Sequence, residues 1–109
     1  MEIVYDKLVR DNIPEMIKKD NAQPFIRVLN DEEYWQYLLK KDTEELEEVK
    51  TAFSPEEVKK ELADKLELIR AMAEFNGFSL QDIIDTANKK REKNGGFQKK
   101  ILLEKVIEK

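Results

Sequence analysis

Apolar residues recur every three or four positions over three long stretches of the chain, which is the spacing of one buried face of an α-helix. These stretches predict three long helices, which begin after Asn30, Ser54 and Ser79 and run to about Ala52, Phe75 and Lys93. A shorter pattern predicts a helix from about Ile13 to Lys19. The chain is therefore expected to be mainly helical.

The boundaries of the long helices follow from local chemistry. Each begins with a polar residue that can accept a hydrogen bond from the first turn, and each has an acidic residue three positions later, which is the capping-box arrangement. Pro55 occupies the first helical position, where its missing N–H leaves no hydrogen bond unmade. Asn76 and Gly77 form a typical C-terminal cap.

Two segments outside the helices carry strand-like patterns. Residues 24–29, PFIRVL, are rich in β-forming side chains and are flanked by turn residues, so they predict a strand. The tail from Phe97 to Ile107 fits either a terminal helix or a second strand pairing with residues 25–29. The strand is favoured because a lone strand leaves its backbone groups without partners. The predicted fold is an all-α antiparallel helix bundle with a minor two-stranded β-hairpin, forming one domain over residues 1–109.

Two pairs of acidic residues interrupt the apolar faces of the first two long helices. Glu45 and Glu48 form one pair and Glu61 and Asp64 the other, each at i, i+3 spacing. Glu45 and Glu61 fall within the apolar faces themselves, with their partners beside them. A buried carboxylate is costly unless it is paired with a positive charge or binds a cation.

This spacing is suited to binding a divalent metal ion. Side chains three residues apart on a helix lie about 5–6 Å apart at Cβ, so two carboxylates can share one ion. Mg²⁺ and Mn²⁺ prefer oxygen ligands, and substrate phosphates often complete their coordination. The alternative is that these acids form ordinary solvated helix surface with weak lysine pairs. The residue pattern alone leaves both interpretations open.

Composition narrows the chemistry that the chain can perform. Of its 109 residues, 40% are charged, the net charge is −4, and there is no cysteine or histidine. A thiolate nucleophile, a zinc–sulfur site and a histidine base are therefore excluded. The interleaved charges give no sign of binding a nucleic acid polymer. We expect no membrane partner and a cytoplasmic location, because no apolar run reaches about 20 residues and no signal-peptide pattern is present.

The motif Glu45-x-x-Glu48, followed after twelve residues by Glu61-x-x-Asp64, resembles the signature of the MazG-type all-α nucleoside triphosphate pyrophosphohydrolase superfamily. That superfamily includes phosphoribosyl-ATP pyrophosphatases and dimeric dUTPases. Residues 5–14, YDKLVRDNIP, resemble the start of a small house-cleaning branch related to phosphoribosyl-ATP pyrophosphohydrolases. The run GGF at residues 95–97 fits the same picture.

The resemblance implies hydrolysis of a nucleoside triphosphate, canonical or not, between its α and β phosphates. It implies Mg²⁺, with Mn²⁺ as an alternative, as the cofactor, and a metal-activated water as the nucleophile. It assigns Glu45, Glu48, Glu61 and Asp64 as metal ligands. Glu44 and Glu45 are the expected catalytic residues, with Glu44 either a further ligand or the group that orients the water.

Basic side chains are expected to contact the phosphates. The candidates are Lys7 and Arg10 near the N-terminus and Lys90 and Arg91 at the end of the third long helix. Alternatively, Lys7 and Arg10 are solvated or paired with an aspartate, and Lys90 and Arg91 interact with the helix dipole. Lys65 is expected either to neutralise Glu61 or to touch a phosphate.

One departure from the pattern and one set of aromatic residues leave the substrate open. Asn94 stands where the resemblance leads us to expect an arginine, so an arginine contact there is not expected. The aromatic side chains could stack on a base, but aromatic residues at helical spacing usually belong to a core. They are Tyr34, Trp35, Tyr37, Phe53, Phe75 and Phe78.

We expect a homodimer or higher homo-oligomer, because the apolar faces exceed what one copy can cover. The rival hypothesis for function is a catalytically silent helical module that binds a nucleotide or a protein.

Overall fold

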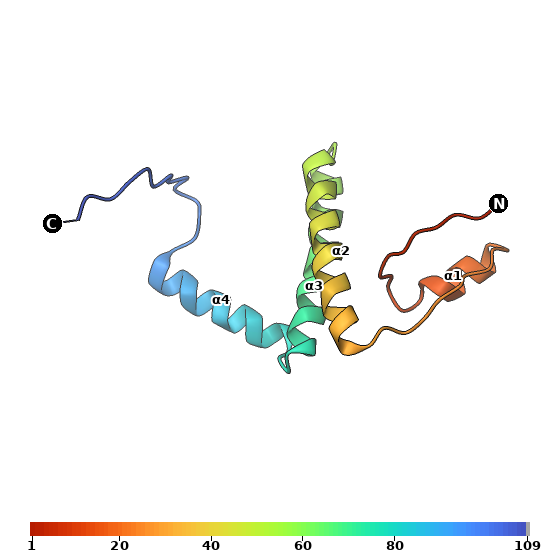
Figure 1. Cartoon of the computed structure of the whole chain (residues 1–109). Coiled ribbons are helices and arrows are strands. Elements are labelled where there is room, and N and C mark those ends of the chain that lie inside the picture. The colour runs from red at the N-terminus through yellow and green to blue at the C-terminus, as the bar shows by residue number, and fades with distance from the viewer. Residues whose placement is uncertain (109) are drawn as a thin grey trace.

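The computed structural model describes residues 1–108 and contains four α-helices. They are α1 (Ile13–Lys19), α2 (Asp31–Thr51), α3 (Pro55–Phe75) and α4 (Leu80–Asn94), as Figure 1 shows. The helical fold class is confirmed, and each helix ends within about one residue of its predicted limit. No helix within residues 1–108 is long and apolar enough to cross a membrane.

The predicted caps form at the start of the three longer helices. The side chains of Asn30, Ser54 and Ser79 each accept a hydrogen bond from the backbone N–H three residues later. Only Ser79 belongs to a complete capping box, in which Asp82 Oδ2 also accepts from the backbone N–H of Ser79 at 2.9 Å. At the start of α2 the acidic side chain, Glu33, instead binds Arg27 at 2.8 Å.

The helices α2 and α3 form an antiparallel hairpin, because residues 52–54 between them are too few to allow any other direction. The part of the hairpin away from the loop is packed around Leu38, which is 1% exposed, and Ala73, which is 5% exposed. Aromatic rings extend this contact: Phe75 stacks on Trp35 with ring centroids 5.5 Å apart, and Tyr34 meets Phe75 edge-on. These three rings therefore pack beside the core, as their spacing suggested, whereas Phe53 and Phe78 are 94% and 54% exposed and do not.

The helices α1 and α4 lie on opposite sides of this hairpin (Figure 1). The helix α4 follows the turn at Asn76–Gly77 and packs only against α3, near the point where α3 ends. Gly77 has a φ of 86°, a left-handed conformation that glycine adopts without steric cost. Within one copy the expected antiparallel bundle is thus reduced to the hairpin with α4 attached at one end.

The prediction of a β-hairpin was wrong for the described residues. Residues 24–29 form an irregular connection from α1 to α2, and residues 101–108 form an irregular tail after α4. No backbone–backbone hydrogen bond involves either segment. The two segments lie on opposite sides of the α2–α3 hairpin (Figure 1), so neither can supply the partner that the other needs to become a strand.

The cap at Ser54 matters most for the position of the acidic residues, because it begins the helix that carries two of them. We predict that Ser54→Ala lowers the free energy of unfolding by about 1 kcal/mol, because the N–H of Glu57 loses its acceptor. Ser54→Asn should retain the wild-type stability, since Asn is an equally good cap. Urea unfolding followed by circular dichroism measures both, and equal losses in the two variants would contradict the role of the cap.

Candidate functional site

The acidic residues of the sequence motif lie near the loop end of the α2–α3 hairpin. Glu45 lies toward the C-terminal end of α2, and Glu61 and Asp64 lie toward the N-terminal end of α3. Because the helices are antiparallel and joined by a short loop, these positions face each other across the helix pair. The hairpin therefore brings together side chains that lie on different helices and far apart in the sequence.

The carboxylate groups of Glu45, Glu61 and Asp64 converge. One oxygen from each lies within 4.8 Å of the other two, and all three residues are partly buried. Oxygens bound to one Mg²⁺ ion each lie about 2.1 Å from it, so they stand at most about 4.2 Å apart. Small side-chain rotations therefore suffice to bring all three groups onto one ion.

Glu45 is the most strongly perturbed member of the cluster. Its Oε2 atom is buried and has no hydrogen-bond partner. Burial raises the pKa of Glu45, as do a hydrogen bond between its carboxyl group and that of Glu61 and the negative charge of Asp64. A carboxylate with one buried oxygen and two other acids beside it lacks the positive charge that would make its ionised form favourable. A divalent cation would supply that charge, so the donor set fits a metal ion.

Glu48, the fourth ligand that the motif predicted, lies outside this group. Its side chain is exposed, and it is not one of the three acids whose oxygens converge. A step of three residues rotates a side chain by about 60° around the helix axis. That rotation carries Glu48 from the surface that faces α3 toward solvent.

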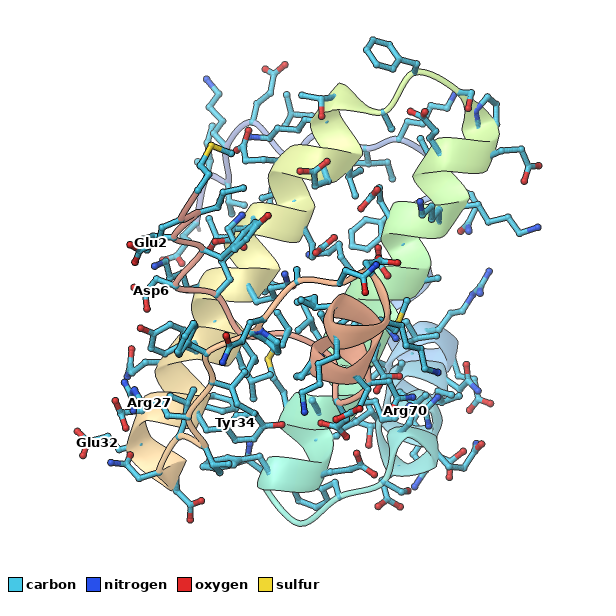
Figure 2. The ribbon with its side chains drawn as sticks, turned by 90° about the vertical axis from the view of Figure 1, so that its right-hand side faces the viewer. Glu2, Asp6, Arg27, Glu32, Tyr34 and Arg70 are labelled. Atoms are coloured by element: carbon cyan, nitrogen blue, oxygen red, sulfur yellow. The ribbon has the colours of Figure 1, made fainter. Side chains whose placement is uncertain are left out.

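The N-terminal segment, residues 1–12, places positive charge beside the acidic cluster. Arg10 Nη2 lies 2.8 Å from Asp64 Oδ1, and Lys7 Nζ lies 4.0 Å from Glu44 Oε2. The segment is held against α2 by a hydrogen bond of 3.1 Å from the Tyr37 hydroxyl to Asp6 Oδ1. Figure 2 shows Asp6 beside α2. For Arg10 the structure thus shows the aspartate-paired alternative.

The other predicted basic residues do not reach the cluster within one copy. Lys65 was expected to neutralise Glu61 or to touch a phosphate, but its Nζ binds Asp42 Oδ1 at 2.8 Å, which ties α3 to α2. Lys90 and Arg91 are exposed on the part of α4 that lies away from the hairpin (Figure 1). The positive charges near the three acids come from the N-terminal segment and from α2.

Sequence analysis missed two residues near the site. Lys41 lies one turn before Glu45 on α2, and its charge lowers the pKa of Glu45, against the effects that raise it. The i, i+4 spacing of Lys41 and Glu45 was a detectable signal. Asp42 could not be linked to Lys65 from the sequence, because that ion pair depends on how α2 and α3 are aligned.

The raised pKa of Glu45 makes the stability of the metal-free protein depend on pH. The folded state holds the Glu45 proton more tightly than the unfolded state does, so the proton adds stability that is complete below the unfolded pKa of about 4.5. That stability is lost as the pH rises through the raised folded pKa. We predict that Glu45→Gln, which is neutral at every pH, abolishes this decline when urea unfolding is measured in EDTA at several pH values. Glu47→Gln, a control at an exposed position, should follow the wild type.

Arg10 should compete with a metal ion for Asp64. We predict that Arg10→Gln raises the affinity for Mg²⁺ by up to about five-fold, because an exposed ion pair contributes about 0.2–1 kcal/mol and must be broken when the metal binds. Titration calorimetry at constant ionic strength measures the affinity. Arg70→Gln is the matched control, since Arg70 pairs with Glu67 elsewhere on α3. An unchanged or weaker affinity in Arg10→Gln would disprove the competition.

Comparison with known proteins adds one partial match. No family model and no solved structure matches this chain. An uncharacterised protein of Mycolicibacterium smegmatis is 48% identical to it over 46 residues, which cover 42% of this chain and 47% of that protein. The chain thus matches about half the length of this relative. Because the relative is uncharacterised, membership of the MazG-type superfamily stays a prediction based on the residues of the motif.

Proposed function

We propose that this protein is a Mg²⁺-dependent nucleoside triphosphate pyrophosphohydrolase of the MazG type, with Mn²⁺ as an alternative metal. Water attacks the α phosphorus, the bond from that phosphorus to the oxygen bridging the α and β phosphates breaks, and the products are a nucleoside monophosphate and pyrophosphate. The observation that carries this proposal is the convergence of Glu45, Glu61 and Asp64, with one buried Glu45 oxygen lacking a partner.

The metal ligands in this proposal are Glu45, Glu61 and Asp64, with Glu48 as a fourth. Glu48 lies on α2 three residues after Glu45, and its flexible side chain is exposed and free to turn. When bound, the metal neutralises phosphate charge and activates a water molecule. The chain has no histidine or cysteine, so its carboxylates, lysines and arginines are left to orient the water, accept its proton and bind the phosphates.

The protein's own side chains have distinct roles in this proposal. Glu44, partly buried beside the cluster and 4.0 Å from Lys7, orients the attacking water and accepts its proton. Arg10 leaves Asp64 and binds the phosphates, for which its planar guanidinium group is well suited. Lys7 adds a second positive charge at the same edge. Lys90 and Arg91 remain predicted phosphate contacts, although a single copy holds them away from the acids.

The MazG-like bundle is part of the same proposal. The helices α2 and α3 would be the two central helices of the bundle, because they carry the acidic motif and bring three of its four acids together. The helix α4 packs on the end of α3 that is remote from the acids. It can therefore move relative to the hairpin without disturbing the three converging carboxylates.

Release of pyrophosphate from a panel of normal and damaged nucleoside triphosphates tests the activity. We predict metal-dependent turnover of at least one nucleotide, abolished by EDTA. Glu61→Gln should reduce kcat/KM by about 100-fold or more, the equivalent of about 2.7 kcal/mol of transition-state stabilisation. Glu47→Gln is the matched control, since Glu47 is exposed and pairs with Lys50 on the solvent side of α2. Equal activity in Glu61→Gln and wild type would refute the proposed site.

Thermal unfolding with and without Mg²⁺ tests the metal site, and together with the pyrophosphate assay it separates this enzyme from the silent binding module. An ion at 100 times its dissociation constant adds about 2.7 kcal/mol of stability, which raises the Tm by roughly 10 °C or more in a chain of this size. The increase should disappear in Glu45→Gln and Glu61→Gln and persist in Glu47→Gln. Stabilisation by metal and nucleotide without pyrophosphate release would favour the silent module.

A further inference from the structure

The N-terminal segment, residues 1–12, lies against the hairpin although it has no regular secondary structure of its own. No backbone–backbone hydrogen bond involves residues 1–9, and Leu8 is the one residue of the segment that is partly buried. An irregular segment with so little buried surface is expected to be mobile, because little offsets the entropy lost when it is held in place. Its position therefore depends on a few polar side-chain contacts.

Two of these contacts follow one another along α2. The Tyr37 hydroxyl donates a hydrogen bond of 3.1 Å to Asp6 Oδ1, and the next residue of the segment, Lys7, places its Nζ 4.0 Å from Glu44 Oε2. Tyr37 and Glu44 are seven residues apart, so they lie on the same face of α2 and about 10.5 Å apart along its axis. The segment thus runs along α2 toward the acidic cluster.

The third contact takes the segment across to α3, where Arg10 Nη2 lies 2.8 Å from Asp64 Oδ1. The ion pairs of Lys7 and Arg10 both use acids of the proposed site, so the arrival of a metal ion or a phosphate group alters both of them. The hydrogen bond from Tyr37 uses none of these acids. It is therefore the polar contact that can hold the segment throughout a cycle of binding and release.

Tyr37 is itself held firmly enough to act as an anchor. It lies on α2 next to Leu38, the most buried residue within residues 1–108, and the Nζ atom of Lys40 lies 5.6 Å from the centroid of its ring. The hydrogen bond to Asp6 and the negative charge of Asp6 raise the pKa of Tyr37. The hydroxyl group therefore keeps its proton near neutral pH and remains a hydrogen-bond donor.

The backbone turns at the residue that Tyr37 binds. Asp6 has a φ of 47°, in the left-handed region that aspartate adopts more readily than most residues with a side chain. A residue stays in this region when the surrounding structure holds it there. The contact with Tyr37 thus fixes the chain at the point where its direction toward Lys7 and Arg10 is set.

We propose that Tyr37, acting through Asp6, is a positioning residue that keeps Arg10 beside the acidic cluster both before and after a metal ion binds. Before metal binding, the anchored segment holds Arg10 on Asp64, where it opposes the metal. Afterwards, the same anchor keeps the released guanidinium group close to the phosphates. This second step rests on the proposed function, whereas the anchor itself does not. Loss of the Tyr37 hydroxyl should therefore strengthen Mg²⁺ binding and weaken nucleotide binding.

Trypsin digestion of the metal-free protein tests the anchor independently of function. Trypsin must bind an extended stretch of chain around Arg10, so it cleaves there when the segment leaves the hairpin. Cleavage after Lys100, in the exposed tail, is the internal reference. We predict that Tyr37→Phe raises the relative rate after Arg10 by about two- to ten-fold, the range expected for one hydrogen bond. A wild-type rate would overturn the proposal.

Tyr34→Phe is the matched control for this digestion. Tyr34 lies on the same helix, its ring packs edge-on against Phe75, and its hydroxyl makes no hydrogen bond within residues 1–108. Removing this hydroxyl should leave the cleavage rate after Arg10 unchanged. Equal acceleration in Tyr34→Phe and Tyr37→Phe would show that a general loosening of α2 is responsible, and would also overturn the proposal.

Ligand affinities separate positioning from damage to the site. Tyr37→Phe should raise the affinity for Mg²⁺, by no more than the five-fold limit expected for Arg10→Gln. At saturating Mg²⁺ it should raise the KM for the nucleotide by about two- to ten-fold and leave kcat unchanged. Damage to the acidic cluster would instead weaken the binding of both ligands. In the Arg10→Gln background, Tyr37→Phe should change neither quantity, because the side chain that it positions is gone.

The outcomes keep the anchor and the proposed function apart. Faster cleavage after Arg10 in Tyr37→Phe, in a protein that neither binds Mg²⁺ nor releases pyrophosphate, would support the anchor and refute the proposed function. Weaker Mg²⁺ binding in Tyr37→Phe would overturn the positioning role. So would equal effects of Tyr37→Phe on Mg²⁺ affinity and KM in the presence and absence of the Arg10 side chain.

Discussion

The central constraint in this protein is the electrostatic cost of holding three carboxylates together between two packed helices. Glu45, Glu61 and Asp64 converge near the loop end of the α2–α3 hairpin, and burial and mutual repulsion raise the pKa of Glu45. Within the chain, Arg10 and Lys41 compensate this charge only in part: one pairs with Asp64 and the other acts on Glu45 from one helical turn away. A cation or a proton is needed to complete the compensation, and that requirement is the physical basis of the proposed metal-dependent chemistry.

The packing of the hairpin determines where the acids meet. At the end away from the loop, Leu38, Ala73 and the rings around Phe75 fix how α2 lies along α3. Nearer the acids, the ion pair of Lys65 and Asp42 ties the two helices at 2.8 Å. None of these contacts uses the three converging carboxylates. The hairpin can therefore keep the acids aligned although their own interactions oppose the arrangement, because the favourable energy comes from other parts of the same helix pair.

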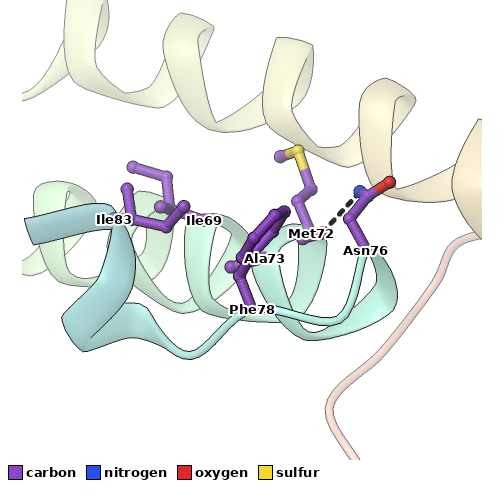
Figure 3. A pocket seen from close by; sticks show the side chains of 6 residues that line it. All are labelled: Ile69, Met72, Ala73, Asn76, Phe78 and Ile83. Atoms are coloured by element: carbon purple, nitrogen blue, oxygen red, sulfur yellow. Dashed lines mark hydrogen bonds between the residues drawn. The ribbon is translucent and has the colours of Figure 1, made fainter. Parts of the chain in front are cut away.

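The hairpin is well defined, but it is too small to account for a stable fold. Apolar side chains remain exposed in one copy on residues 24–29 and on the tail, residues 101–108. The same holds for Phe78, which lines a hollow between α3 and α4 (Figure 3). The acidic residues and the apolar surface thus pose separate physical problems. The first is a shortage of positive charge at one end of the hairpin, and the second is a shortage of apolar contact around the other. The proposed metal ion would address the first, and the homo-oligomer expected from the sequence would address the second.

The sequence by itself determined the helices and their limits, because capping, proline and glycine act within a few residues of each other. Ser54, Ser79 and Gly77 carry that information locally. The sequence also identified Glu45 and Glu61 as unusual acidic residues, since helical periodicity places them on apolar faces. The sequence did not determine whether residues 24–29 form a strand, because a strand needs a partner that the spatial arrangement of the chain does not supply. Only the tertiary structure decided that Arg10 pairs with Asp64, because the irregular N-terminal segment has to lie against the hairpin for the two to meet. It also decided that Lys65 pairs with Asp42 and that Glu48 faces solvent, because these outcomes depend on how far one helix is rotated and shifted against its neighbour.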